Sequence, residues 1–262
     1  MMNEVDEGVL AQRFASLRVV LGGTLHSGNI GAAARAMKNM GLRRLYLVAP
    51  AEFPHREASY RAVQATDVLE SAVVTRTLEE AVAECSLVIG TSARERRIPL
   101  PQLGPRQLGP LCLHEHRGEE VALVFGREDS GLSNEELRLC HWHVHVPTSA
   151  EYSSLNLAAA VQLLCDELRM CALEGTTVLA DPVWDEPPAT IDGMERFYEH
   201  LERTLIDISF LDPAAPRQLM ARLRRLFNRV RLDQMELNIL RGMLTEVDKI
   251  SMKARGEDRS DT

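Results

Sequence analysis

The sequence predicts an α/β protein in which a mostly parallel sheet is followed by a small helical unit. Short β-rich runs alternate with helical stretches between residues 17 and 173, an order typical of parallel sheets covered on both faces. The runs at 87–90 and 121–125 are uniformly apolar, as strands in the centre of such a sheet are. A stretch at 174–191, which contains three prolines and no lysine or arginine, then precedes further helical segments.

The alternation places the individual elements in order along the chain. We expect strands at residues 18–21, 45–48, 72–75, 87–90, 121–125 and 142–146. Helices are expected at 30–40, 78–84 and 135–139, and one long helix is expected at 154–173. The long helix is apolar almost all round, so it must be buried on more than one side, either in the core or at a dimer interface.

The pattern also divides the chain into four regions. They are a flexible leader (1–16), the sheet domain (17–173), a linker (174–191) and a helical C-terminal extension (192–262). In the extension, Asp192, Asp212 and Asp233 each favour a helix start, because a short acidic side chain accepts hydrogen bonds from the first backbone N–H groups. Three helices are therefore expected after the linker.

Composition narrows the class of protein. The net charge of −8 over 262 residues argues against binding nucleic acid along the whole surface, but leaves room for local basic patches. The five cysteines are an odd number without disulfide-type spacing, and the first residues lack the apolar segment of a signal peptide. No apolar run is long enough to span a membrane. We therefore expect a reduced, soluble, cytoplasmic protein.

Several familiar sites are missing. Neither a G-x-G-x-x-G dinucleotide fingerprint nor a Walker A motif occurs in the sequence. His141, His143 and His145 would share one face of a strand and suggest a metal site, but no neighbouring residues have zinc-ligand spacing. Ordinary strand histidines are the favoured interpretation, and no metal is expected.

A glycine-rich turn between the first strand and the first predicted helix is the first candidate site. Gly28 and Gly31 permit a tight turn and a close approach, and Asn29 is a candidate cap for the helix. Arg35 follows nearly two turns later, within reach of an anion at the helix N-terminus. A capped helix with a solvated arginine explains the same residues equally well.

Three more candidate segments follow later strands, where open α/β sheets bind their ligands. Thr91, Ser92 and Ala93 come after one buried strand, although a generic turn is the simpler explanation for them alone. Gly126 and Glu128 come after the next, and an acid at a strand end needs a partner. Beyond them Gly131 permits a sharp reversal, and Ser133 with Glu136 is expected to form a capping box. Further polar residues precede or begin the long helix: Ser153 or Ser154 as its cap, and Asn156, which needs a partner in an apolar segment.

A basic block lies in the C-terminal extension. Six arginines occur within fifteen residues that contain no acid: Arg217, Arg222, Arg224, Arg225, Arg229 and Arg231. A solvated helix face is the usual explanation of a charge run, but arginine is well suited to grip phosphates. We favour contact with an RNA backbone.

Together these segments resemble the SPOUT superfamily of trefoil-knotted RNA methyltransferases. The stretches N-I-G-A-A-A-R, F-G-R-E-x-x-G-L-S-N-E-E and P…S-S-L-N-L-A-A-A-V-Q are similar to its three motifs in order, and the similarity extends from about residue 17 to 246. The resemblance implies a knot at the end of the sheet domain, S-adenosylmethionine as cofactor and a homodimer. It is strongest to members that methylate the ribose 2′-hydroxyl of cytidine or uridine 32 in the tRNA anticodon loop.

The resemblance also implies roles for individual residues. It makes Arg35 the catalytic arginine, with Asn29 and Glu128 in support. The implied cofactor-binding residues are Thr91, Ser92, Ala93, Gly126, Val146, Ser153, Ser154 and Leu155. Because a guanidinium does not readily lose its proton, we expect Arg35 to clamp an RNA phosphate and the developing alkoxide rather than to act as a base. The proton acceptor stays open, and a knotted RNA-binding module without catalysis is the alternative.

Overall fold

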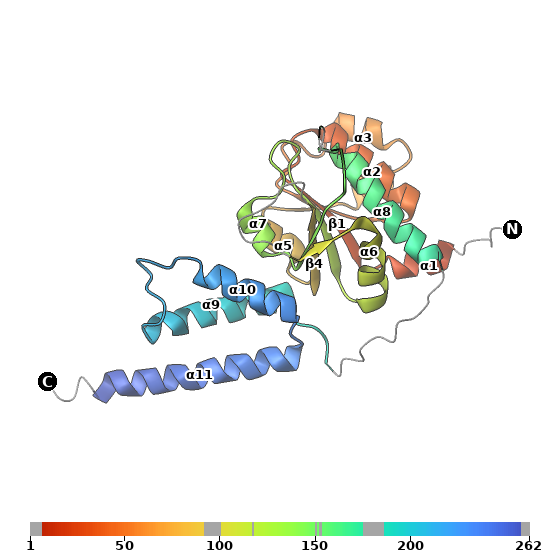
Figure 1. Ribbon diagram of the computed structural model, residues 1–262. Coiled ribbons are helices and arrows are strands. Elements are labelled where there is room, and N and C mark those ends of the chain that lie inside the picture. The colour runs from red at the N-terminus through yellow and green to blue at the C-terminus, as the bar shows by residue number, and fades with distance from the viewer. Residues whose placement is uncertain are drawn as a thin grey trace. The chain divides into compact units, whose positions relative to one another are not determined.

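The computed structural model describes residues 7–91, 101–116, 118–149, 151, 154–174 and 186–257. The chain forms two compact units, one within residues 1–182 and one within 183–262 (Figure 1). No helix in the described part of the chain combines the length and hydropathy needed to cross a bilayer.

The first unit is built on a seven-stranded parallel sheet with the order β3-β2-β1-β6-β4-β7-β5. Its strands are β1 (Leu17–Gly22), β2 (Arg44–Val48), β3 (Val73–Thr75), β4 (Leu87–Thr91), β5 (Gln102–Leu103), β6 (Val121–Phe125) and β7 (Trp142–Val144). The parallel α/β fold and its six predicted strands are confirmed. The two-residue β5 was not predicted, because so short a strand has no periodicity to recognise. The knot implied by the resemblance stays a prediction.

The central strands form the core of this unit. β1 and β6 are completely buried and pair in register from Leu17 with Val121 to Leu21 with Phe125. β4 continues the buried centre on the other side of β6. Strands covered on both faces must be apolar throughout, which is why these runs carried the clearest signal in the sequence.

Helices cover both faces of the sheet. They are α1 (Glu7–Arg13), α2 (Ser27–Met40), α3 (Arg56–Ala62), α4 (Thr66–Glu70), α5 (Leu78–Val82), α6 (Pro105–Pro110) with a π-helical turn at Leu111–Glu115, α7 (Asn134–Arg138) and α8 (Leu157–Leu173). Figure 1 shows α2, α6 and α8 on one side of the sheet and α5 and α7 on the other. α8 packs against both α2 and α6, so the expected burial on more than one side is confirmed.

The beginning of the chain differs from the sequence expectation. Helix α1 forms inside the stretch predicted as a flexible leader, and Leu10 and Phe14 are buried. Arg169 of α8 donates to Glu7 Oε1 (2.6 Å), and Arg13 Nη1 donates to the carbonyl of Ala172 (3.0 Å). Contact with a helix more than 150 residues away stabilises this segment, and its local sequence does not reveal that contact.

Two predicted helix caps are also corrected. α2 starts at Ser27, with His26 at the N-cap position, so Asn29 lies inside the helix and does not cap it. α8 starts at Leu157 and is capped by Asn156, whose Oδ1 accepts from the N–H of Ala158 (3.0 Å), instead of by Ser153 or Ser154. In both cases the asparagine side chain also has a partner far away in the sequence, which local spacing does not reveal.

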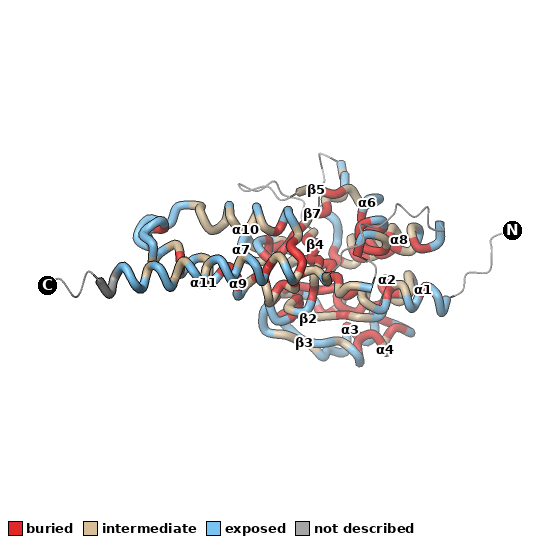
Figure 2. The backbone as a smooth tube through the Cα atoms, turned by 90° about the horizontal axis from the view of Figure 1, so that it is seen from below, coloured by how far each residue is buried: buried red, intermediate tan, exposed pale blue. Residues whose placement is uncertain are grey.

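The second unit consists of α9 (Ile191–Asp207), α10 (Leu219–Val230) and α11 (Gln234–Glu257). Its small core contains Met194, Phe197, Tyr198 and Leu237. Figure 2 shows that most of α9, α10 and α11 is exposed or only partly buried. Phe197 meets Phe227 edge-on, with ring centroids 5.0 Å apart. The expected three helices are thus present, and α11 packs along α9.

Of these three helices, one has the N-cap residue that the sequence predicts. α11 has the expected cap, since Asp233 Oδ1 accepts from the N–H of Glu236 (2.7 Å). α9 is capped by Thr190, which accepts from Gly193 N–H (3.2 Å), instead of by Asp192. Asp212 accepts from Ala214 N–H (2.9 Å) in a turn, and α10 begins only at Leu219. Short acidic residues favour turns as well as caps, so the pattern alone does not separate them.

Candidate active site

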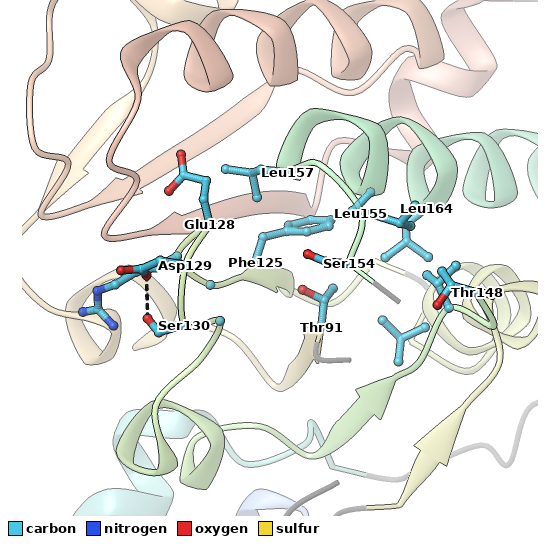
Figure 3. Close-up of a pocket in the computed structure, with 16 residues that line it drawn as sticks. Thr91, Phe125, Glu128, Asp129, Ser130, Thr148, Ser154, Leu155, Leu157 and Leu164 are labelled. Carbon is cyan, nitrogen blue, oxygen red and sulfur yellow. Dashed lines mark hydrogen bonds between the residues drawn. The ribbon is translucent and has the colours of Figure 1, made fainter. Parts of the chain in front are cut away.

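A cavity of about 270 Å³ opens at the carboxyl ends of β4, β6 and β7. Figure 3 shows its lining, with Glu128 and Asp129 toward one end and Thr148 and Leu164 toward the other. The lining comes from strand ends, from the loop after β6 and from the start of α8. Segments that are far apart in the sequence therefore meet where parallel sheets bind their ligands.

All five of the predicted cofactor-binding residues that the structure describes share this cavity. Thr91, Gly126, Val146, Ser154 and Leu155 all line it. Ser92, Ala93 and Ser153 lie outside the described residues. The apolar part of the wall, which the sequence did not single out, comes from Phe125, Val144, Leu157, Ala160 and Leu164.

Gly126 is required by the way the loop after β6 folds back on itself. A Cβ atom at Gly126 would lie 2.2 Å from both the carbonyl carbon of Gly131 and the nitrogen of Leu132. The N–H of Gly131 donates to the carbonyl of Arg127 (2.9 Å), and Gly131 has φ +68°. The sharp reversal predicted at Gly131 is confirmed, and it holds residues 127–130 at the cavity wall.

Glu128 has the partners that an acid at a strand end needs. Its carboxylate accepts from Leu25 N–H (2.9 Å), His26 N–H (3.3 Å) and Asn29 Nδ2 (2.9 Å). Burial by itself raises the pKa of Glu128, but these N–H donors outweigh it and lower the pKa below its ordinary value. The carboxylate is ionised, and it ties the loop after β6 to the turn before α2.

Asn29 extends this connection to the third segment. Its Nδ2 donates to Glu128, and its Oδ1 accepts from Asn156 Nδ2 (3.2 Å). Asn156 in turn caps α8 through Ala158. The sequence showed that Asn156 needed a partner, but it could not identify Asn29, which lies 127 residues away.

Arg35 is exposed on α2, beyond this network. Arg127 is a cation at the cavity that the sequence analysis missed; its Nη1 lies 3.6 Å from Glu136 Oε2. Glu136 also accepts from Ser133 N–H (2.6 Å) in the capping box that was predicted and is confirmed. A capping residue that also pairs with an arginine outside its helix could not be recognised from local spacing.

Comparisons with known proteins identify the family of the chain. The model of the SpoU rRNA Methylase family matches residues 16–166, and that of the TrmJ tRNA methyltransferase C-terminal domain matches residues 192–259. The chain belongs to the TrmJ family of SpoU methylases. The resemblance drawn from the three motifs is therefore confirmed at the level of the family.

The TrmJ relatives match nearly the whole chain. A Pseudomonas aeruginosa protein named tRNA (cytidine/uridine/adenosine-2′-O-)-methyltransferase TrmJ is 54% identical over 248 residues, covering 90% of this chain and 95% of its own. A Yersinia enterocolitica protein named tRNA (cytidine/uridine-2′-O-)-methyltransferase TrmJ is 49% identical, covering 94% and 97%. Among solved structures, TrmJ from Z. mobilis ZM4 has a TM-score of 0.77 at 33% identity, covering 88% of this chain and 98% of that one.

The arginine block, which lies in the part that matches the TrmJ C-terminal domain, is divided by the structure. Arg224 pairs with Glu195 of α9, and its guanidinium lies 4.3 Å from the centroid of the Tyr198 ring. The hydroxyl of Tyr198 donates to Asn228 Oδ1 (2.6 Å). Arg224 therefore has partners within its own unit. Arg217, Arg222 and Arg229 are exposed, and Arg225 is half-buried.

Two of the strand histidines and four of the five cysteines lie in the interior of the first unit. His141 and His143 are buried, and His141 Nδ1 accepts from Val88 N–H (3.0 Å). Among the described residues no group of three or more histidines, cysteines or acids is placed to hold a metal ion. All five cysteines are free thiols, and burial raises the pKa of Cys85 to about 12, so that thiol behaves as a small apolar side chain.

Proposed function

We propose that this chain transfers the methyl group of S-adenosylmethionine to a ribose 2′-hydroxyl of tRNA. One observation carries the proposal: the Glu128–Asn29–Asn156 network joins the wall of the cavity to the helix that bears Arg35. A donor in the cavity and an RNA backbone at Arg35 would thereby be held in one rigid frame. Such alignment of two reactants supplies a large part of the rate of a transfer reaction.

The cavity suits the proposed cofactor. Its apolar residues offer a surface for an adenine ring, and Gly126 allows the ligand to approach the backbone closely. The carboxylates of Glu128 and Asp129 at one end favour a cationic group, as a sulfonium is. When bound, S-adenosylmethionine supplies the electrophilic methyl group; the residues of this chain supply its position.

Arg35 acts on the RNA side of the reaction. Its guanidinium donates hydrogen bonds to a phosphate next to the reacting ribose and stabilises negative charge as it develops on the 2′-oxygen. It does not accept the proton, because arginine stays charged in proteins. Glu128 and Asn29 act as positioning residues. The Glu128 carboxylate accepts hydrogen bonds from the turn before α2 and from Asn29.

The substrate and the assembly belong to the same proposal. The nucleotide is cytidine or uridine 32 of the tRNA anticodon loop, in keeping with the names of the relatives. In the C-terminal unit Arg217, Arg222, Arg225 and Arg229 grip the tRNA backbone, whereas Arg224 stabilises the unit itself. The working form is a homodimer in the cytoplasm.

Mass spectrometry of tRNA nucleosides tests the reaction directly. Purified protein with S-adenosylmethionine and unmodified tRNA should produce 2′-O-methylcytidine or 2′-O-methyluridine at position 32. Calorimetry should show that the protein alone binds the cofactor. Binding of tRNA without any affinity for S-adenosylmethionine would contradict the proposal and would support an RNA-binding module without catalysis.

A further inference from the structure

A surface next to Arg35 has no role in the reaction described so far. It consists of Arg56, Tyr60 and Arg61 on α3 and of Val63 directly after it, and we call it the α3 surface. Tyr60 is 80% exposed, and Val63 is exposed as well. Arg56 and Tyr60 are four residues apart and thus share one face of the helix, opposite the buried Ala58 and Ala62.

The packing of α3 on α2 places this surface beside Arg35. A Cβ atom at Gly31 would lie 2.0 Å from the carbonyl oxygen of Ala58, so the backbones of α2 and α3 are in close contact at this point. Figure 1 shows the two helices as neighbours. One turn beyond Arg35, Lys38 Nζ donates to the carbonyl of Gln64 (2.7 Å). Gly31, Arg35 and Lys38 lie on one stripe of α2, because they are four and three residues apart. Arg35 therefore lies alongside the last turn of α3.

The end of α3 is held in an unusual conformation. Val63 follows the helix with φ +55°, a region that β-branched residues rarely adopt because of steric strain. The surrounding packing must compensate for this strain, and strained residues of this kind often occur where a protein binds its ligand. Here the strained residue is also an exposed apolar one, next to an exposed aromatic ring.

The charges around Tyr60 are mainly positive. Arg35 and Arg56 are exposed and make no ion pair with any residue that the structure describes. Arg61 lies 3.8 Å from Glu57 Oε1, and such an exposed pair leaves the cation largely solvated. An aromatic ring flanked by guanidinium groups is the combination that binds single-stranded nucleotides, by stacking on bases and contacting phosphates.

We propose that the α3 surface binds tRNA nucleotides adjacent to the one held at Arg35, with Tyr60 stacking on an unpaired base and Arg56 contacting a phosphate. This proposal rests on the proposed function, because it takes the RNA at Arg35 as its starting point. It adds a recognition surface for the loop that is separate from both the cofactor cavity and the C-terminal arginines.

Binding of unmodified tRNA to full-length variants tests the ring. Tyr60→Ala should weaken binding about tenfold, within the range measured for the loss of one stacked base. Tyr60→Phe keeps the ring and should bind as the wild-type protein does. In steady-state methylation, Tyr60→Ala should raise KM for tRNA and leave kcat and cofactor affinity nearly unchanged. The reason is that Tyr60 does not line the cavity and does not contact the RNA phosphate proposed to bind at Arg35.

The salt dependence of binding tests the cation. Arg56→Ala should make the plot of log affinity against log salt concentration less steep, by the amount expected for the loss of about one phosphate contact. Arg76→Ala is the matched control, because Arg76 is 92% exposed on the same unit but follows the edge strand β3. It should leave the slope unchanged.

Two outcomes would overturn the proposal. Wild-type affinity of Tyr60→Ala for tRNA, in a reaction that still methylates position 32, would refute the α3 surface and leave the proposed function intact. A change in the number of copies in the assembly, measured by sedimentation and without a change in RNA affinity, would assign the surface to a protein contact. Failure of the wild-type protein to methylate tRNA would instead refute the proposed function itself.

Discussion

Arg35 in the first unit and Arg224 in the second have opposite surroundings. Glu128 at the cavity is bound by backbone and amide N–H groups, and Arg35 is exposed on α2. In the second unit, an acid of α9 binds Arg224 from α10, and an aromatic ring lies under the same guanidinium. Arg35 is therefore available to a ligand, whereas Arg224 is engaged within its own unit.

The units also differ in what stabilises them. The first has a large core around completely buried strands, and its polar network connects loops above that core. The second has a small aromatic core and depends more on partly buried polar contacts between its helices, such as those of Arg224 and Asp248. Substitution of Arg35 should thus affect the chemistry, and substitution of Arg224 the stability of its unit.

The largest effect is expected for Arg35→Ala. Loss of the group that stabilises the developing charge should slow methyl transfer by about 100-fold or more in single-turnover assays. Affinity for S-adenosylmethionine should be unchanged, because Arg35 does not line the cavity. Arg35→Lys keeps the charge but loses the two-pronged hydrogen bonding and should recover only part of the rate. Full activity in Arg35→Ala would show that Arg35 has no role in the reaction.

Gly126→Ala should be the most destabilising change at the site. The new methyl group would meet the backbone of Gly131 and Leu132, so the loop must move, at a cost of about 2–3 kcal/mol. Urea unfolding measures the loss, and calorimetry should show weaker cofactor binding. Gly104→Ala is the matched control, since the nearest atom to its Cβ is a side-chain oxygen 3.5 Å away. Equal stability of the two variants would contradict the geometry of the loop.

Two neighbouring arginines test the contrast within the second unit. Arg224→Ala removes the pair with Glu195 and the contact with Tyr198, and should destabilise the unit by about 1–2 kcal/mol. Arg225→Ala should leave stability unchanged and weaken tRNA binding, with a smaller salt slope. Hydrogen exchange of α9–α11 reports the first effect and a binding titration the second. The reverse assignment of the two effects would refute the division of the arginine block.

The smallest effect concerns Asp248 on α11. Its carboxylate accepts from Thr204 (2.6 Å) and contacts His200 (2.8 Å), and these hydrogen bonds lower its pKa below the ordinary 3.8. A lowered carboxyl pKa stabilises the folded state above the ordinary value, and this stabilisation is lost as the pH falls through the folded value. Asp248→Asn should therefore cost about 1 kcal/mol or less near pH 7, and the difference should shrink as the pH falls below the ordinary carboxyl pKa of 3.8.

Hydrogen exchange between pH 3 and 7 measures this dependence. Glu246→Gln is the control, because Glu246 pairs only at the surface, with Lys249 three residues on. A difference between the wild-type protein and Asp248→Asn that stays constant down to pH 3 would show that the carboxylate does not stabilise the unit.

The sequence by itself determined the features that depend on local pattern. The buried strands β4 and β6 followed from uniform apolarity, and the capping boxes at Ser133 and Asp233 followed from short spacing. The three motif segments led to the family and to the residues that line the cavity. These features involve residues within a few positions of one another, or side chains whose burial follows from their chemistry.

Only the tertiary structure decided which polar groups meet. Glu128 and Asn29 are 99 residues apart, Asn29 and Asn156 are 127 apart, and Arg224 lies 29 residues from Glu195. Each of these side chains had a plausible local role, as a cap, a turn or a surface charge. A hydrogen bond or an ion pair acts over a few ångströms, so its partner is known only once the sheet and the helices have brought distant segments together.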